Sequence, residues 1–280
     1  MRTRYVVIVF FCLLLCCRAS ALEVPRHSPA STYTVGIVPQ YEARRIYKIW
    51  RPILDKLEAA TGLHFTLRGS PSIPAFESEF IAGAFDFAYM NPYHISPARN
   101  RQGYIPLVRD VGRRLQGILV VRKDSPIRSV QQLAGRVVAF PSPNALGASM
   151  LIRAELLDKF QLQVIPRYVL SHSSVYLNVI LEQTVAGGGV QSTLQQQPDN
   201  IKNKLRVLYR TQSIAPHPFA AHPRVAPKIR AQVRQAFLAL GQSKEGRQLL
   251  ARVPIRRIGP SRMMDYEPLS KLKLQRFYQQ

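Results

Sequence analysis

Residues 32–69, TYTVGIVPQYEARRIYKIWRPILDKLEAATGLHFTLRG, contain a helix pattern between two strand patterns. The run TYTVGIV predicts a buried strand that ends at Pro39, and the alternating run LHFTLRG predicts a second strand. Between residues 42 and 60 apolar side chains recur at helical spacing, and Gly62 is suited to end that helix. The apolar positions are Ile46, Ile49, Trp50, Ile53, Leu54 and Leu57. A strand–helix–strand unit of this kind builds a parallel sheet, so we expect an α/β fold.

The alternation of strand and helix patterns continues along most of the chain. We expect further strands at 85–90, 104–111, 114–127, 136–140, 163–170, 185–190 and 205–211, and a mostly helical region after Pro223. The segments 114–127 and 205–211 suit a chain that leaves one α/β lobe and later returns to it. We therefore expect one lobe from residues 32–115 and 214–280 and another from residues 116–213, joined by paired crossover strands. A small ligand is expected in the cleft between them.

The first 21 residues have the features of a secretory signal peptide. Arg2 and Arg4 precede an apolar run at 5–17, and the small residues at 19–21 supply a cleavage signal. We expect cleavage after Ala21 and export to the periplasm; an uncleaved anchor and lipid attachment at Cys17 are the alternatives. All three cysteines lie in this leader, so the mature chain is expected to have neither disulfides nor thiol chemistry.

The chain is strongly basic, with 39 lysine and arginine residues against 16 acidic residues and a net charge of +23. Loss of three arginines with the leader would leave 36 basic residues against 16 acidic ones, a net charge of +20. The basic residues are scattered along the chain, which disfavours nucleic-acid binding by an exported protein. The charge instead favours anionic ligands or a negatively charged membrane face.

Four predicted helices begin just after strands: near Tyr41, at Asn91, at Asn144 and near His172. In strand–loop–helix units, such helix starts gather at the carboxyl edge of the sheet. A helix N-terminus attracts negative charge because its first N–H groups are unpaired and its dipole is positive there. We therefore expect several helix starts to converge on one small oxyanion.

Several segments resemble the phosphate/phosphite/phosphonate-binding proteins of ABC transporters, the PhnD-like group. They are residues 35–62, FDFAYMNPYHI at 85–95, DSPIRSVQQLAGRVVAF at 124–140, SHSSVYLNVILEQTVAGGGV at 171–190 and TQSIAPHPFAAHPRV at 211–225. The similarity covers about Tyr33 to Leu240. It implies a type II periplasmic binding protein fold with two α/β lobes, and a role in delivering a ligand to an ABC permease.

Two stretches depart from the pattern of this group. Its phosphonate binders usually carry a Ser-Thr-Ser-Gly loop, whereas residues 142–147 here are Ser-Pro-Asn-Ala-Leu-Gly. Its aminophosphonate binders carry acidic residues near the glycine-rich strand, whereas residues 187–193 here (GGGVQST) include none. These departures disfavour an aminophosphonate. Phosphate, phosphite, a phosphonate-like compound and a sulfur oxyanion are the candidate ligands.

The candidate ligand-binding residues offer hydroxyl, amide or imidazole groups, or belong to a loop before a helix. They are Tyr41, Tyr89, Asn91, Tyr93, Ser142, Asn144, Ala145, His172, Ser173 and Ser174. His172 matches a histidine that precedes a helix in the family, and it can meet an oxyanion as a cation or as a neutral donor. A capping or buried structural role is the alternative for His172, and helix capping is the alternative for Asn144. Asp86 is expected to serve structure at a strand start.

The sequence gives no support to other kinds of chemistry. The histidines lack metal-site spacings, and the chain has neither a G-x-S-x-G nor a Walker A motif. The glycines at 187–189 are not expected to form a phosphate loop, because no helix start is predicted after them. We expect a monomeric binding protein, not an enzyme, with no metal and no cofactor. Its expected partner is an ABC permease; the alternative is a ligand sensor that docks on a membrane kinase or cyclase.

Overall fold

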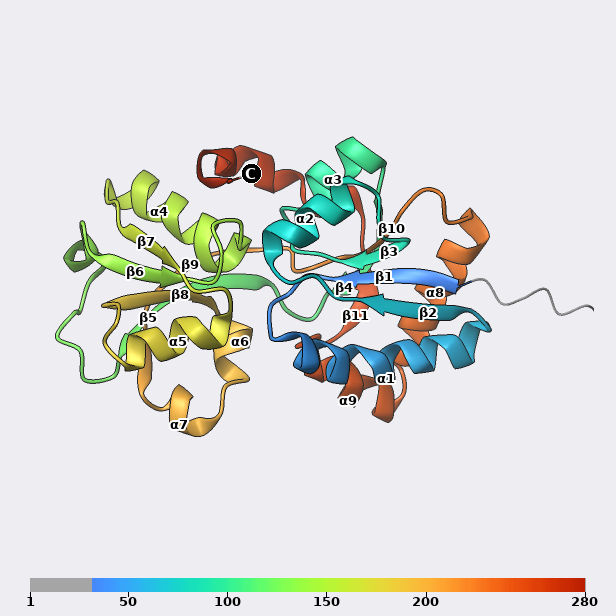
Figure 1. Cartoon of the computed structure of the whole chain (residues 1–280), viewed down its shortest axis with the longest axis horizontal. Helices are drawn as coiled ribbons and strands as arrows, with labels where there is room; N and C mark the ends of the chain where they lie inside the picture. The colour runs from blue at the N-terminus through green and yellow to red at the C-terminus, as the bar shows by residue number, and fades with distance from the viewer. Residues whose placement is uncertain (1–31, 280) are drawn as a thin grey trace, which may run out of the picture. The chain divides into compact units, whose positions relative to one another are not determined.

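Two β-sheets organise the chain, which is described here from residue 32 to residue 279 by a computed structural model (Figure 1). These residues belong to one compact unit. The predicted leader, its cleavage after Ala21 and the lipid attachment at Cys17 lie outside the described residues. Among the helices within 32–279, none is both long and apolar enough to cross a bilayer.

The first sheet has the strand order β11-β4-β10-β3-β1-β2. Its strands are β1 (Thr32–Ile37), β2 (His64–Arg68), β3 (Phe87–Tyr89), β4 (Ile105–Asp110), β10 (Phe219–Ala221) and β11 (Ile258–Pro260). Strand β1 pairs in parallel with both β2 and β3, as the opening strand–helix–strand pattern predicts. Helices α1 (Ala43–Thr61), α8 (Pro227–Leu240) and α9 (Lys244–Arg252) cover one face, and α2 (Ile73–Ile81) and α3 (Ile95–Gln102) cover the other (Figure 1).

The second sheet has the order β7-β6-β8-β5-β9. Its strands are β5 (Leu115–Arg122), β6 (Val137–Phe140), β7 (Ile165–Tyr168), β8 (Ala186–Val190) and β9 (Leu205–Ile214). The π-helix η2 (Leu146–Met150) continues into α4 (Leu151–Phe160) on one face, whereas α5 (His172–Ile180) and α6 (Gln191–Gln195) lie on the other. The 3-10 helix η1 (Val130–Leu133) and α7 (Asp199–Lys202) complete this part of the chain.

Strands β5 and β9 carry the chain from one sheet to the other and back. They pair antiparallel from Leu115 opposite Ile214 to Arg122 opposite Leu205. The mixed α/β architecture with paired crossover strands is therefore confirmed. The lobe boundaries, 32–115 with 214–280 and 116–213, stay a proposal.

Glycines allow η2 to pack directly on the second sheet. A Cβ atom on Gly117 would clash with the carbonyl oxygen of Gly147, and one on Gly188 would clash with that of Ala148. Only glycine lets two backbones approach so closely. The run at 187–189 thus has a packing reason that needs no phosphate loop.

Two local predictions are wrong, and the region after Pro223, which is mostly helical as predicted, holds one short strand besides. Helix α3 begins at Ile95, not at Asn91, because residues 91–94 form a turn in which Asn91 Oδ1 accepts the N–H of Tyr93 at 2.7 Å. A helix start does follow the glycine run, since α6 begins directly after β8. The short strand is β11, which antiparallel pairing with β4 holds at the sheet edge.

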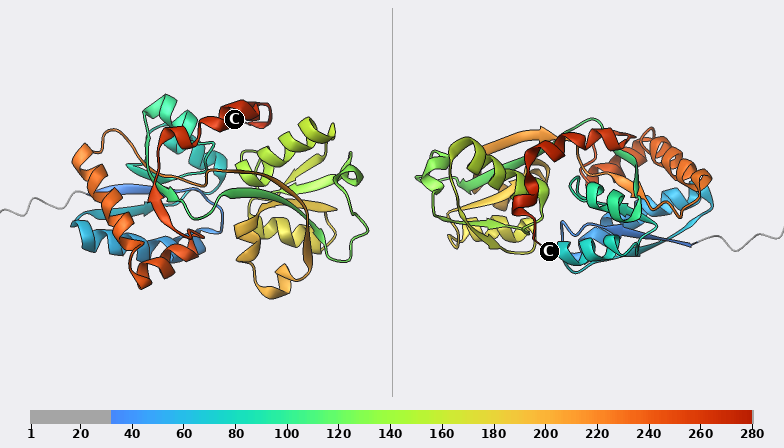
Figure 2. Two further views of the ribbon diagram at one scale, coloured as in Figure 1. Left: turned by 180° about the vertical axis from the view of Figure 1, so that it is seen from behind. Right: turned by 90° about the horizontal axis from the view of Figure 1, so that it is seen from above.

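Short 3-10 helices form the C-terminal segment: η3 (Met263–Asp265), η4 (Glu267–Leu272) and η5 (Leu274–Phe277). This segment leaves the first sheet and ends beside α4 of the second sheet (Figure 2). Arg276 makes two hydrogen bonds to Asp158, at 3.0 and 2.8 Å, and Arg153 donates to the carbonyl of Phe277 at 2.9 Å. The C-terminal segment therefore connects elements of both sheets.

Candidate functional site

A narrow cavity lined mostly by apolar residues, with four polar side chains, lies where loops from both sheets meet. Its volume is about 20 Å³, and it is lined by Val38, Gln40, Ile73, Asn91, Leu115, Ala145, Leu146, Gly147, Ala148, His172, Val190 and His217. A cavity of this size holds about one water molecule. The walls must therefore move apart before a ligand as large as phosphate can enter.

The loops that line the cavity follow the carboxyl ends of parallel strands, as the sequence predicts. Gln40 follows β1, Asn91 follows β3, residues 145–148 follow β6 and His172 follows β7. Of the predicted site residues, Asn91, Ala145 and His172 are brought together at the cavity. The other seven lie around it or elsewhere.

Residues 146–148, the first turn of the helix at 146–160, line this cavity. Ala145 precedes the helix, and its carbonyl accepts the N–H groups of Ser149 at 2.7 Å and Met150 at 3.2 Å. The N–H groups of the first turn, residues 146–148, have no partner within a helix, and all three residues line the cavity. This turn can donate several hydrogen bonds to one anion.

His172 is the first residue of α5 and is buried, with its ring at the cavity. The cap of this helix is Ser171, whose side chain accepts the N–H of Ser174. Nδ1 of His172 lies 3.3 Å from Oγ1 of Thr193, which donates its own hydrogen to the carbonyl of Val190. Burial lowers the pKa of His172 from 6.5 to about 4, so the ring is neutral at neutral pH.

His217 is a second buried histidine at the cavity, and the sequence analysis missed it. Its Nε2 lies 2.8 Å from Nε2 of Gln40, so the amide donates to a neutral ring. The ring stacks on Tyr89 with 5.4 Å between centroids. Burial, with smaller contributions from His94 and His172, lowers the pKa of His217 to about 3.

A sequence signal for Gln40 and His217 does exist, although it is indirect. Gln40 follows the proline that ends β1, and His217 stands between two prolines where the chain re-enters the first sheet. Polar side chains at a strand end beside proline are held close to the sheet edge. Only the fold brings the end of β1 and the start of β10 together at the same edge of the first sheet.

Asn144 holds the site together and is completely buried, with its side chain bonded to protein groups. Its Nδ2 donates to Glu77 Oε2 at 2.6 Å and to the carbonyl of Gln279 at 2.7 Å, and its Oδ1 accepts the Gln279 N–H at 2.9 Å. The predicted capping role is wrong, because Ala145 occupies the N-cap position. Asn91 Nδ2 donates to the carbonyl of Asn144 at 3.0 Å, which links the two loops.

Beneath this junction lies a buried acid–histidine pair. Glu77 Oε1 lies 2.8 Å from Nε2 of His94, and both side chains are almost completely buried. The pair supports Asn91 and Asn144 from the side of α2 and α3. The sequence analysis proposed no role for either residue.

The three predicted tyrosines have different surroundings. Tyr41 donates its hydroxyl to Gln196 Oε1 at 2.9 Å, and burial raises its pKa to about 12. Tyr89 is buried between Trp50 and His217. Tyr93 is half-buried and packs against Tyr278 of the C-terminal segment.

The three predicted serines also differ in their surroundings. The Ser142 hydroxyl is buried and has no hydrogen-bond partner among the described residues, and Ser142 does not line the cavity. Ser174 bonds to the capping Ser171, with 2.9 Å between their hydroxyl oxygens. Ser173 is half-buried and does not line the cavity. Asp86 accepts the Thr34 N–H at 2.8 Å and an Arg224 bond at 2.6 Å, which agrees with its expected structural role.

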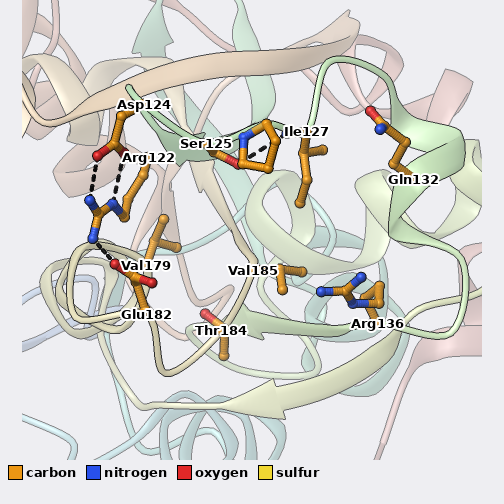
Figure 3. A pocket seen from close by; sticks show the side chains of 11 residues that line it. Arg122, Asp124, Ser125, Ile127, Gln132, Arg136, Val179, Glu182, Thr184 and Val185 are labelled. Carbon is orange, nitrogen blue, oxygen red and sulfur yellow. Dashed lines mark hydrogen bonds and ion pairs between the residues drawn. The ribbon is translucent and has the colours of Figure 1, made fainter.

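A larger cavity of about 450 Å³ opens elsewhere on the second sheet (Figure 3). It is lined by Arg122, Asp124, Ser125, Pro126, Ile127, Gln132, Arg136, Val179, Glu182, Thr184 and Val185. Figure 3 shows that the Arg122 guanidinium is bonded to both Asp124 and Glu182, so its charge is balanced within the wall. This cavity contains none of the predicted site residues. Within 32–279 no group of three or more histidine, cysteine or acidic residues is placed to hold a metal ion.

Comparison with known proteins supports the architecture of the two sheets. A family model described as the periplasmic substrate-binding protein of ABC phosphonate transporters matches residues 35–266. No curated protein sequence matches the chain.

Solved structures with the same fold share little sequence with this chain. A binding-protein component of an ABC phosphonate transporter from Pseudomonas aeruginosa is 16% identical and superposes with a TM-score of 0.79, covering 89% of this chain and 88% of that one. PhnD1 from Prochlorococcus marinus, solved with methylphosphonate, is 15% identical with a TM-score of 0.79 and coverages of 87% and 97%. A Xanthomonas citri protein solved with chloride is 19% identical with a TM-score of 0.71 and coverages of 88% and 98%.

The fold and the cavity define a substrate-binding protein of the type II periplasmic class. The chain belongs to the family of periplasmic substrate-binding proteins of ABC phosphonate transporters. The resemblance found in the sequence is thereby confirmed. Membership places the protein in the periplasm and gives it a small ligand and a membrane permease as partners.

Proposed function

We propose that the protein captures a small tetrahedral oxyanion, phosphate, phosphite or a simple phosphonate, and delivers it to its ABC permease. The observation that carries this proposal is that residues 146–148, the first turn of the helix at 146–160, line the cavity. Amides at a helix start bind oxyanions without a charged side chain. The sensory role stays an untested alternative.

The side chains at the cavity support the same class of ligand. His172 and His217 are neutral in the free protein, and each can take up a proton when an anion approaches. The buried hydroxyl of Ser142 supplies another possible donor. Among the residues that line the cavity, none is Asp, Glu, Lys or Arg. A ligand with an ammonium group would therefore find no carboxylate to balance it.

A thermal-shift screen of the purified protein tests the proposal. Inorganic phosphate, phosphite, methylphosphonate, sulfate and 2-aminoethylphosphonate are compared at equal ionic strength. At one hundred times its Kd, a ligand stabilises the native state by about 2.7 kcal/mol, which raises the Tm by about 5–10 °C for a chain of this size. We expect such a rise in Tm with at least one phosphorus oxyanion. The amino group of 2-aminoethylphosphonate should not raise the Tm further.

Two serine variants provide a matched control. Ser142 and Ser149 both have buried hydroxyls without a partner among the described residues, but only Ser142 is a predicted ligand residue. Ser142→Ala should weaken oxyanion affinity about 10- to 150-fold, the effect of losing one hydrogen bond to a charged group. Ser149→Ala should leave affinity unchanged. If no oxyanion shifts the Tm while a sugar or a cation does, the proposal is wrong.

A further inference from the structure

One segment carries a larger share of the positive charge than its length would predict, although basic residues also occur along the rest of the chain. Residues 223–262, called the basic segment below, contain ten lysine and arginine residues and one acidic residue, Glu245. These 40 residues, one seventh of the chain, carry nine of its 23 net positive charges. We propose that the basic segment is a docking surface for the headgroups of an anionic phospholipid bilayer.

Most of this charge is exposed and not neutralised within the protein. Arg224 pairs with Asp86, and Glu245 pairs with Lys56 of α1. The other nine basic side chains form no salt bridge among the described residues, and all but the half-buried Arg230 are exposed. They are Lys228, Arg230, Arg234, Lys244, Arg247, Arg252, Arg256, Arg257 and Arg262. Such charges attract an anionic surface over about a Debye length.

The fold gathers these charges on connected elements. Helices α8 and α9 pack against each other and against α1, on the face of the first sheet opposite α2 and α3 (Figure 2). Arg256 and Arg257 follow α9, where their main-chain N–H groups donate to the Asp110 carboxylate at 2.8 and 3.0 Å. That contact fixes the backbone and leaves both guanidinium groups outside.

The chemistry of this surface favours lipid headgroups over an acidic protein. A specific protein interface is built on buried aromatic and aliphatic anchors inside a polar rim. The large apolar side chains that are exposed among the described residues are Tyr47, Ile165, Leu170, Leu177, Leu181 and Met264. None of them belongs to the basic segment. Electrostatic attachment to a bilayer needs no such anchor, only basic residues near the surface.

Vesicle co-sedimentation of the whole protein tests the proposal. Vesicles of phosphatidylcholine alone are compared with vesicles that contain about 30% phosphatidylglycerol, at an ionic strength of about 0.15 M. We expect binding to the anionic vesicles only, with loss of binding at about 1 M salt. This result does not depend on the oxyanion, so failure here would leave the proposed transport function untouched.

A pair of quadruple variants separates the basic segment from overall charge. Lys228→Gln, Arg234→Gln, Lys244→Gln and Arg247→Gln together should lower vesicle partitioning on the order of 100-fold or more, at roughly fivefold for each residue. Lys123→Gln, Arg128→Gln, Arg136→Gln and Lys204→Gln remove the same charge from exposed positions of the second sheet. This control should retain most of the binding.

Any result other than these would overturn the proposal. Equal losses in the two variants would mean that net charge, not this surface, drives adsorption. Absence of vesicle binding, combined with impaired transport by the first variant, would assign the basic segment to an acidic protein partner instead. Circular dichroism and thermal unfolding check that both variants remain folded.

Discussion

At the residue scale, folding buries the rings of two histidines at the cavity. His172 and His217 are buried, and burial is the main cause that lowers the pKa of each ring, to about 4 and about 3. A ring that stays neutral can accept or donate a hydrogen bond, and it gains a proton only when a negative charge compensates it. The same burial makes the free protein sensitive to acid.

The free energy of unfolding should therefore fall as the pH decreases. A histidine whose pKa is lowered on folding binds fewer protons in the native state, so its stabilisation is fully present above pH 6.5 and is lost between pH 6.5 and its folded value near 3 to 4. Each such ring contributes a slope of up to about 1.4 kcal/mol per pH unit. Urea unfolding from pH 7 to pH 4 measures this slope.

Histidine variants isolate this contribution from that of the carboxylates. His217→Gln should reduce the slope of the free energy of unfolding against pH by the contribution of about one proton. His64→Gln, at an exposed position, should leave that slope unchanged. An unchanged slope in His217→Gln would show that the ring is accessible to protons in the native state. A bound oxyanion should weaken this pH dependence, because the anion favours the protonated ring.

At the element scale, the C-terminal segment is a structural part of the site. The main chain of Gln279 makes two hydrogen bonds to the Asn144 side chain, as a neighbouring β-strand would. Its N–H donates to Asn144 Oδ1, and its carbonyl accepts from Asn144 Nδ2. Hydrogen bonds of Arg276 and of the Phe277 carbonyl connect the same segment to α4. The loop before the anion-binding turn is therefore positioned by residues more than one hundred places further along the chain.

Removal of a single N–H tests this role. Gln279→Pro deletes the donor to Asn144 Oδ1 and leaves that buried oxygen unsatisfied, so it should destabilise the protein by about 1–2 kcal/mol. Gln279→Ala keeps both main-chain bonds and should be nearly neutral. The comparison is made by urea unfolding and by oxyanion affinity. Equal stabilities of the proline and alanine variants would show that the hydrogen bond from the Gln279 N–H to Asn144 does not stabilise the protein.

At the scale of the whole molecule, a few side chains link the two sheets around the cavity. Tyr41, after β1, donates to Gln196 at the end of α6, and Gln196 in turn donates to the carbonyls of Ala251 and Arg252 at 3.2 and 3.3 Å. Asn91 and Asn144 make a second link. Because the cavity has room for about one water, these links must loosen when a ligand enters or leaves.

Loss of the tyrosine hydroxyl should therefore speed ligand release. Tyr41→Phe removes the bond to Gln196, which is worth about 0.5–1.5 kcal/mol, so koff should rise about 2- to 10-fold with little change in kon. Stopped-flow measurements use the oxyanion that gives the largest thermal shift. Tyr47→Phe, at an exposed position of the same helix region, is the matched control. An unaltered koff would mean that this link stays broken in the ligand-bound protein.

Much of the architecture could be predicted because the signals are local. The apolar spacing of α1, the alternation in β1 and β2 and the left-handed Gly62 at the helix end are set within a few residues. The predicted helix start at Asn91 failed because an Asn side chain satisfies either a helix start or a tight turn equally well. Local pattern cannot choose between them.

The sequence by itself determined the α/β class, the family and the loops after β1, β3, β6 and β7 as the place to look for a ligand. Only the tertiary structure decided which side chains meet there. The fold places Gln40 and His217 at the cavity, and it directs the Asn144 side chain into hydrogen bonds with Glu77 and Gln279. It also places the basic helices α8 and α9 side by side on the first sheet. The physical reason is that periodicity and turn chemistry act between near neighbours, whereas a site is made by contacts between residues far apart in the chain.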